Sequence, residues 1–268
     1  MIEFLLKVSV FCCKKDFVMI KLFNYAINIG EQMLISGAEV HRVEESITRM
    51  CRAFGAVRTD VFIITSSMVV TIHTPNGETY TQTRRVMNSS SNFEKLHLLN
   101  DLSRKICQKG ITEQEIEEKF NEAIHCKKNS VLSEFVSFAV IACAFTLFFG
   151  GNLTEAAISF FVGAIVRLGI YFCSKVTKSK IFDKFLAATI ATSLAFVAVK
   201  IGWISSVDMI IIGNIMSLIP GIGLTNALRD LFTGDSISGL LRLIEAALIA
   251  LSIAAGYFLV AFLGGFAL

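Results

Sequence analysis

Residues 208–245, DMIIIGNIMSLIPGIGLTNALRDLFTGDSISGLLRLIE, decide how the rest of this chain is interpreted. An unbroken helix from Val207 to Ile219 would rise about 20 Å, which is short of the roughly 30 Å hydrocarbon core of a membrane. The break at Pro220, Gly221 and Gly223 should therefore lie inside the membrane or at its edge, where proline leaves backbone groups unpaired.

Two interpretations of this broken helix stay open. Many transporters use the free NH and C=O groups of a broken helix to bind a polar solute. The polar residues in and after the break fit that use, and they are Asn214, Ser217, Thr225, Asn226, Arg229, Asp230 and Asp235. Alternatively, Pro220 only kinks the helix and shapes its packing.

Charge divides the chain into two parts near Ser130. The 268 residues are 54% hydrophobic, and residues 1–130 hold 17 of the 25 Lys and Arg and 15 of the 22 Asp and Glu. With a mean hydropathy of +0.64 the chain is too apolar for one ordinary soluble domain. The prediction is an α-helical integral membrane protein with an N-terminal cytosolic α+β domain at 1–130 and a membrane domain at 131–268. The net charge of +3 is too small and dispersed to indicate nucleic-acid binding.

The first part combines helical and strand patterns. Residues 1–18 are interpreted as a cytosolic leader, and Met19 is a possible start because helical periodicity becomes clear there. After a helix at 19–35, a capping box of Ser36 and Glu39 predicts a second helix at 37–54. Three β-branched segments with a turn at TPNGET predict an antiparallel meander. Two more helices follow, one closed by Gly110 and one opened by a capping box of Thr112 and Glu115.

The helix at 37–54 is dense in charge on one side. Its candidate residues are Glu39, His41, Arg42, Glu44 and Glu45. His41 and Glu45 lie one turn apart and could hold a metal or act in acid–base chemistry, although a solvated face with ordinary ion pairs explains the same residues, and two candidate ligands do not make a closed site. No nucleotide-binding loop, nucleophile elbow or metal-spaced cluster is present in the sequence, so we expect no cofactor, no metal and no enzyme activity.

Five apolar spans follow Ser130, each about the 20 residues that a crossing needs. They are 131–149, 154–173, 181–199, 207–228 and 243–263. Basic residues gather in the loop SKVTKSK and near Arg229 and Arg242, which predicts a multi-pass protein of the cell membrane with a cytoplasmic N-terminal domain. Small residues spaced four apart in the last span, Ala246, Ala250 and Ala254, favour close contact with a partner helix.

Arg167 is the most informative charge inside a span, because charges there are costly. It could bind a substrate carboxylate. It could also form a structural bridge to Glu134, Asp183 or Glu245, or extend to the interface as arginines near helix ends do.

Two segments together carry a family resemblance. SLIPGIGLTNALRDLFTGDSISGLLRLIEAAL resembles the membrane motif of the threonine/serine exporter family, and SGAEVHRVEESITRMCRAFG resembles the cytosolic helix of the same family. The chain lacks a second set of membrane helices and is therefore similar to the larger subunit of the family's split form.

The resemblance implies a secondary transporter without cofactors, driven by the proton gradient. Its implied substrates are threonine and serine, or a dicarboxylate such as succinate, and its implied partner is a short companion membrane subunit or a second copy. The implied motif residues are Pro220, Gly221, Thr225, Asn226, Arg229 and Asp230, with Gly239 and Arg242 as supports. Asp230 is the candidate proton carrier, with a structural cap between Arg229 and Asp230 as the alternative. The other function classes considered are a membrane-tethered enzyme and a sensor acting through the cytosolic domain.

Overall fold

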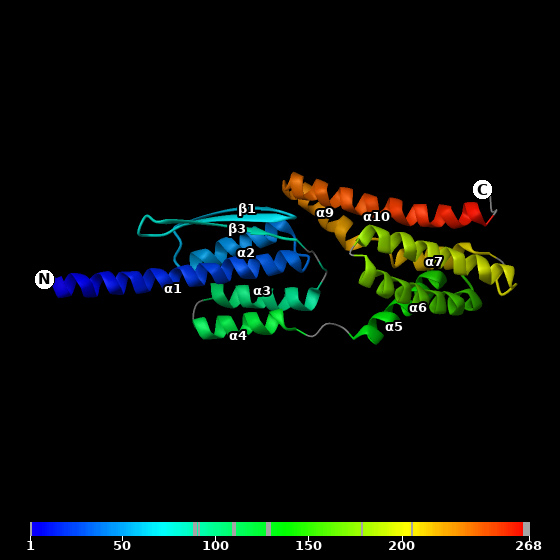
Figure 1. Ribbon diagram of the computed structural model, residues 1–268, viewed down its shortest axis with the longest axis horizontal. Coiled ribbons are helices and arrows are strands. Elements are labelled where there is room, and N and C mark those ends of the chain that lie inside the picture. The colour runs from blue at the N-terminus through cyan, green and yellow to red at the C-terminus, as the bar shows by residue number, and fades with distance from the viewer. Residues whose placement is uncertain are drawn as a thin grey trace. The chain divides into compact units, whose positions relative to one another are not determined.

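The computed structural model describes residues 2–87, 90, 92–108, 111–126, 130–177, 179–204 and 206–264, with side chains from residue 19 onward. These residues form two compact units (Figure 1). We call residues 1–127 and 226–241 the α+β unit, and residues 128–225 and 242–268 the helical unit. The segment 226–241, which the sequence placed in the membrane part, thus groups with the N-terminal residues.

The α+β unit contains four helices and one antiparallel sheet besides the segment 226–241. The helices are α1 (Ile2–Ile35), α2 (Val40–Ala53), α3 (Phe93–Cys107) and α4 (Glu113–Ile124), and the strands are β1 (Arg58–Ile64), β2 (Ser67–His73) and β3 (Thr79–Arg85). The strand order β1-β2-β3 confirms the predicted meander. The turn between β2 and β3 also lies where TPNGET predicted it, with Gly77 at a φ of 83° that glycine adopts without strain.

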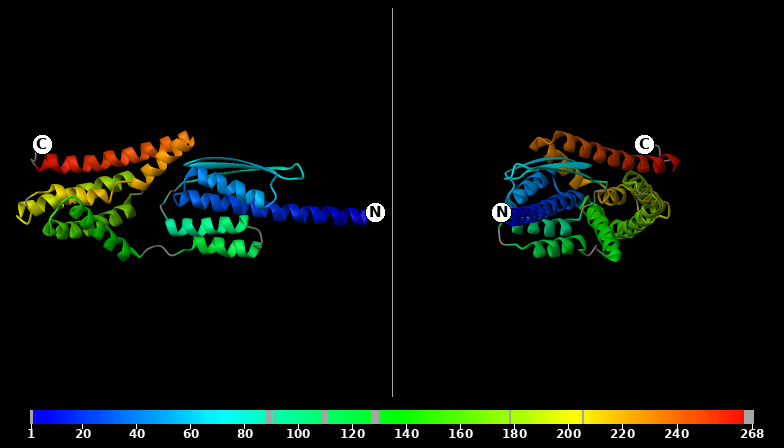
Figure 2. Two further views of the ribbon diagram at one scale, coloured as in Figure 1. Left: turned by 180° about the vertical axis from the view of Figure 1, so that it is seen from behind. Right: turned by 60° about the vertical axis from the view of Figure 1, so that its left-hand side comes forward.

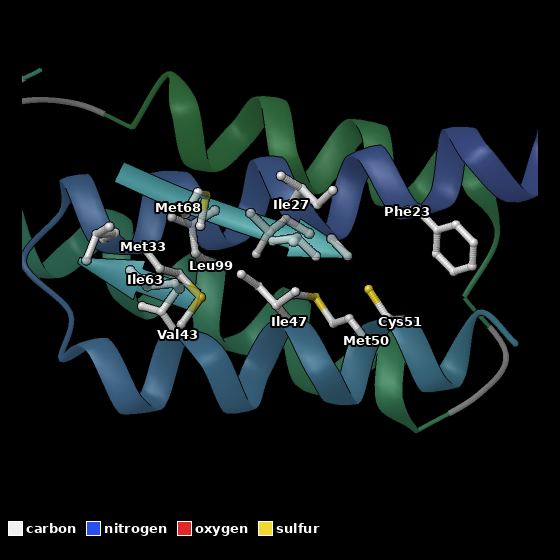
Figure 3. Packing of buried hydrophobic residues seen from close by; sticks show 14 of the residues in the cluster. Phe23, Ile27, Met33, Val43, Ile47, Met50, Cys51, Ile63, Met68 and Leu99 are labelled. Atoms are coloured by element: carbon white, nitrogen blue, oxygen red, sulfur yellow. The ribbon is translucent and has the colours of Figure 1, made fainter. Parts of the chain in front are cut away.

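The core of the α+β unit lies between its layers. The sheet packs on α2, and α1 and α2 separate it from α3 and α4 (Figures 1 and 2). Alternate β2 residues point inward because side chains of a strand alternate between its faces. They meet large apolar side chains of α1, α2 and α3, among them Ile27, Ile47, Met50 and Leu99 (Figure 3). Each such side chain contributes about 1.5–3 kcal/mol when fully buried.

One of the two predicted capping boxes is wrong. Ser36 Oγ donates to the carbonyl of Gln32 at 2.7 Å, because Ser36 belongs to the end of α1 and Gly37 turns the chain with a φ of 96°. Glu39 precedes α2 but its side chain makes no cap hydrogen bond. The Thr112–Glu115 capping box at the start of α4 is confirmed.

The helix predicted at 19–35 is present and extends further toward the N-terminus, because α1 begins at Ile2. Residues 2–18 contain neither proline nor glycine, so nothing in their sequence interrupts a helix. The predicted helix end at Gly110 lies outside the described residues.

The helical unit contains the apolar helices. They are α5 (Val131–Phe148), α6 (Leu153–Val176), α7 (Lys180–Lys200), α8 (Asp208–Met216), and parts of α9 (Gly221–Thr233) and α10 (Ser236–Leu263). Within the described residues, α5, α6, α7 and α10 are each long and apolar enough to cross a membrane. The fifth predicted span is the pair α8 and α9, which is bent by 56°. The Pro-Gly break in that span is therefore confirmed.

Small residues allow the helices of this unit to approach closely. A Cβ added at Gly163 of α6 would lie 2.8 Å from the Ala142 Cβ of α5. A Cβ at Gly256 of α10 would lie 2.5 Å from the carbonyl oxygen of Phe185 in α7. Such contacts replace the burial of large side chains as the means of packing membrane helices.

Candidate functional site

The break between α8 and α9 leaves a helix start open. Met216 ends α8, and the turn to α9 is closed by hydrogen bonds from Gly221 N–H to Ile219 O and from Leu224 N–H to Pro220 O, both at 2.9 Å. A Cβ at Gly221 would meet no atom within 4 Å, and one at Gly223 would meet only the Pro220 Cβ at 3.8 Å. The first turn of α9 is therefore accessible, and helix N-termini attract carboxylates.

A buried network of neutral polar side chains lies in the helical unit. Asn214 Nδ2 of α8 donates to Ser159 Oγ of α6 at 2.9 Å, and Thr146 Oγ1 of α5 donates to the same Ser159 Oγ at 2.7 Å. All three residues are almost fully buried, and Ser217 Oγ adds a bond of 2.7 Å to the carbonyl of Asn214. The Asn214 Oδ1 atom has no hydrogen-bond partner among the described residues. An unpaired buried acceptor is costly, which marks this atom as an exception within the network.

Two members of that network were not singled out from the sequence. Thr146 and Ser159 lie in apolar spans that contain other hydroxyl residues as well, and a hydroxyl side chain there is a weak signal because it can bond to its own helix. Asn214 was predicted, and its Nδ2 atom also bonds to the Ile210 carbonyl at 2.9 Å. Only the packing of α5, α6 and α8 brings the three residues together.

Arg167 has a protein carboxylate as its partner. Its Nη2 donates to Glu134 Oε2, and its guanidinium lies 5.8 Å from the centre of the Phe138 ring. Of the structural bridges considered from the sequence, the one to Glu134 is present. Glu245 instead pairs with Lys180 at 3.5 Å. A direct role of Arg167 in substrate binding stays a prediction.

The two family-like segments meet within the α+β unit. Arg229 Nη1 of α9 donates to Glu39 Oε1 at 2.7 Å, and Asn226 Nδ2 donates to the Gly37 carbonyl at 3.3 Å. Arg229 therefore pairs with a carboxylate 190 positions away in the sequence.

Further acidic residues lie in this unit. Asp230 is only 1% exposed. Glu44 Oε1 accepts from the Ile63 N–H at 3.1 Å. Burial raises the pKa of the Glu44 carboxyl above its usual value, and the charge of Asp235 raises it further, against the smaller lowering effects of the Ile63 hydrogen bond and His41. Asp230 as the proton carrier stays a prediction.

The other charged residues of α2 are solvated. Glu45 Oε1 and Arg49 Nη2 form an exposed ion pair at 2.5 Å one turn apart, and His41 and Arg42 are exposed. These contacts favour the solvated face over acid–base chemistry at His41 and Glu45. In the part of the chain that the structure describes, no three His, Cys, Asp or Glu side chains are grouped as metal ligands.

Gly239, a predicted support of the motif, packs tightly, since a Cβ there would lie 2.9 Å from the Ala227 carbonyl.

The sequence comparisons agree with the predicted resemblance. The family model for the threonine/serine exporter (ThrE) matches residues 24–264. A Klebsiella aerogenes protein named "Probable succinate transporter subunit YjjP" is 25% identical over 232 residues, which cover 84% of this chain and 86% of that protein. The protein of Corynebacterium glutamicum named "Threonine/serine exporter" is 26% identical over 245 residues, covering 88% of this chain and 50% of that protein. No solved structure matches significantly.

Both relatives are named for transport or export rather than for catalysis, as the sequence predicted. The apolar helices are those of a membrane protein. The match covers most of the sequence, and the chain therefore belongs to the threonine/serine exporter family.

Proposed function

We propose that this chain is a subunit of a secondary transporter that exports small carboxylate-bearing metabolites, driven by the proton gradient. The candidate substrates are threonine and serine, or a dicarboxylate resembling succinate, after the names of its two relatives. The α+β unit would face the cytoplasm. A short companion membrane subunit or a second copy would complete the pathway, because one relative is named as a subunit.

The observation that carries this proposal is the broken helix with its accessible start. The start of α9 presents the positive end of the helix dipole to a carboxylate, and the glycines at 221 and 223 leave room for its approach. Asn214 adds a buried acceptor in the helical unit. The proposed substrate-binding residues are those predicted from the sequence, namely Asn214, Ser217, Pro220, Gly221, Gly223, Thr225, Asn226, Arg229 and Arg167.

Asp230 is the proposed proton carrier. Its side chain is almost completely withdrawn from solvent, where a carboxylate charge is costly. Gaining a proton removes that charge, so protonation can be linked to a change in the environment of α9.

The experiment is efflux of preloaded labelled threonine and succinate from proteoliposomes, with and without an imposed proton gradient. The reconstituted protein is the chain alone or the chain with its companion subunit. We expect gradient-driven efflux that Asp230→Asn abolishes while membrane insertion is kept. Glu45→Gln is the matched control, because Glu45 forms only an exposed ion pair. Absence of efflux from the wild-type chain with its companion, or unchanged efflux in Asp230→Asn, would contradict the exporter or the proton-carrier role respectively.

A further inference from the structure

The guanidinium of Arg229 is held on one side and open on the other. Its Nη1 bonds to Glu39, which is its sole polar partner among the described residues. The Arg229 side chain is 60% exposed, whereas that of Glu39 is 17% exposed. A guanidinium has five N–H donors in a rigid plane, so most of its donors stay available. Arg229 can therefore bind a second carboxylate without losing Glu39, in the two-pronged geometry that arginine favours.

The position of Glu39 is set by tertiary contacts. Glu39 precedes α2, where a side chain commonly caps the helix, but it makes no such bond and reaches Arg229 instead. The neighbouring bond from Asn226 to the Gly37 carbonyl holds α9 at the same turn. Two connections from one turn to one helix keep the two side chains in place before any ligand arrives, and a pre-organised site loses less entropy on binding.

Glu39 places a carboxylate directly beside the Arg229 guanidinium. The Glu39 carboxylate is mostly buried, with 17% of its side chain exposed, so its charge is only partly screened by solvent. A cationic group beside Glu39 would thus be attracted, and an anionic group would be repelled. The ion pair consequently offers donors for one carboxylate next to an acceptor for one ammonium group.

We infer that Glu39 and Arg229 bind the ammonium and carboxylate groups of a zwitterionic amino acid and so select it over a substrate that bears only carboxylates. The inference rests on the proposed function. In an α-amino acid the two charges are borne by groups on the same carbon, so the carboxylate on Arg229 brings the ammonium to Glu39. A dicarboxylate bound to Arg229 has no ammonium group to offer Glu39 and would bring a second negative charge toward that carboxylate.

The test compares two ligands that differ only in the ammonium group, serine and 3-hydroxypropanoate, with succinate as a third. Binding to the full chain in lipid nanodiscs is measured by equilibrium dialysis. We expect the wild type to prefer serine, and Glu39→Gln to reduce that preference by about fivefold, the upper range for a partly exposed ion pair. Glu39→Asp keeps the carboxylate and should keep the preference for serine. Arg229→Gln should weaken all three ligands.

A merely structural tether gives a different result. In that case Glu39→Gln would weaken serine and 3-hydroxypropanoate equally and leave their ratio unchanged. That result overturns the inference, as does a wild type that binds 3-hydroxypropanoate as well as serine or that binds neither. Glu45→Gln on the same helix is the control and should match the wild type. Wild-type efflux from proteoliposomes judges the exporter proposal independently of this ratio.

Discussion

The interiors of the two units are built from different residues. In the α+β unit the fully buried side chains are large, as at Ile47, Met50 and Leu99. In the helical unit many buried residues are alanines, such as Ala142, Ala188 and Ala191. Its large apolar side chains point outward instead, with Phe148 78% exposed and Leu251 67% exposed.

This difference is the one expected between a unit surrounded by water and a unit surrounded by lipid. Water drives large apolar side chains inward, because burying their surface is the main favourable term of folding. Lipid tails are as apolar as leucine, so burial gains little there and close backbone approach decides the packing. The comparison predicts that cavities should harm the α+β unit most, whereas added atoms should harm the helical unit most.

The largest expected effect is a cavity in the α+β unit. Leu99→Ala removes a fully buried side chain of α3 and should lower the free energy of unfolding of that unit by about 2–5 kcal/mol. Hydrogen exchange of the α1 and α2 amides measures it. Phe148→Ala, which removes an outward-facing side chain, is the matched truncation and should change the stability of the helical unit by only about 0.5 kcal/mol. Equal losses of stability in Leu99→Ala and Phe148→Ala would contradict the proposed difference between the interiors of the two units.

A single added methyl group should be the next largest effect. A Cβ at Gly213 would lie 2.2 Å from Thr146 Oγ1 and 2.9 Å from the Ala142 carbonyl, so Gly213→Ala should destabilise the helical unit by about 1–3 kcal/mol. Gly221→Ala is the control, because its Cβ would meet no atom within 4 Å. Thermal unfolding in detergent should separate the two variants, and similar midpoints would refute the tight contact of α5 with α8.

The smallest expected effect concerns Glu44. Its raised pKa means that the ionised carboxyl is less favourable in the folded state, so its contribution to stability falls as pH rises through 4.5 toward the raised value. Glu44→Gln can still accept from the Ile63 N–H but does not titrate. The variant should show a flatter stability curve above pH 4.5 and a fraction of a kcal/mol more stability at neutral pH, since Glu44 is only half-buried.

Denaturation of the α+β unit between acid and neutral pH measures this slope. Glu45→Gln should keep the wild-type slope, because Glu45 is exposed and paired with Arg49. If the stability of Glu44→Gln falls with pH as steeply as that of the wild type, Glu44 is not the cause of the pH dependence.

Local sequence patterns predicted most of the elements and the family. The meander, the Thr112–Glu115 capping box and the break at Pro220 all depend on neighbouring residues, so they could be read from short segments. The Ser36–Glu39 capping box failed because the Glu39 carboxylate has a partner far away in the chain. The contacts of the Thr146 and Ser159 hydroxyls with each other and with Asn214 could not be predicted, because nothing beside these residues in the sequence marks them.

The α+β part, the apolar spans and the helix broken at Pro220 can be predicted from the residues alone, because strand alternation, span length and proline geometry are local properties. Which polar groups face one another depends on how the helices and the sheet pack. This packing brings Glu39 to Arg229, Glu134 to Arg167 and Asn214 to Ser159. Side chains carry little information about partners tens of residues away, and packing of the helices selects those partners.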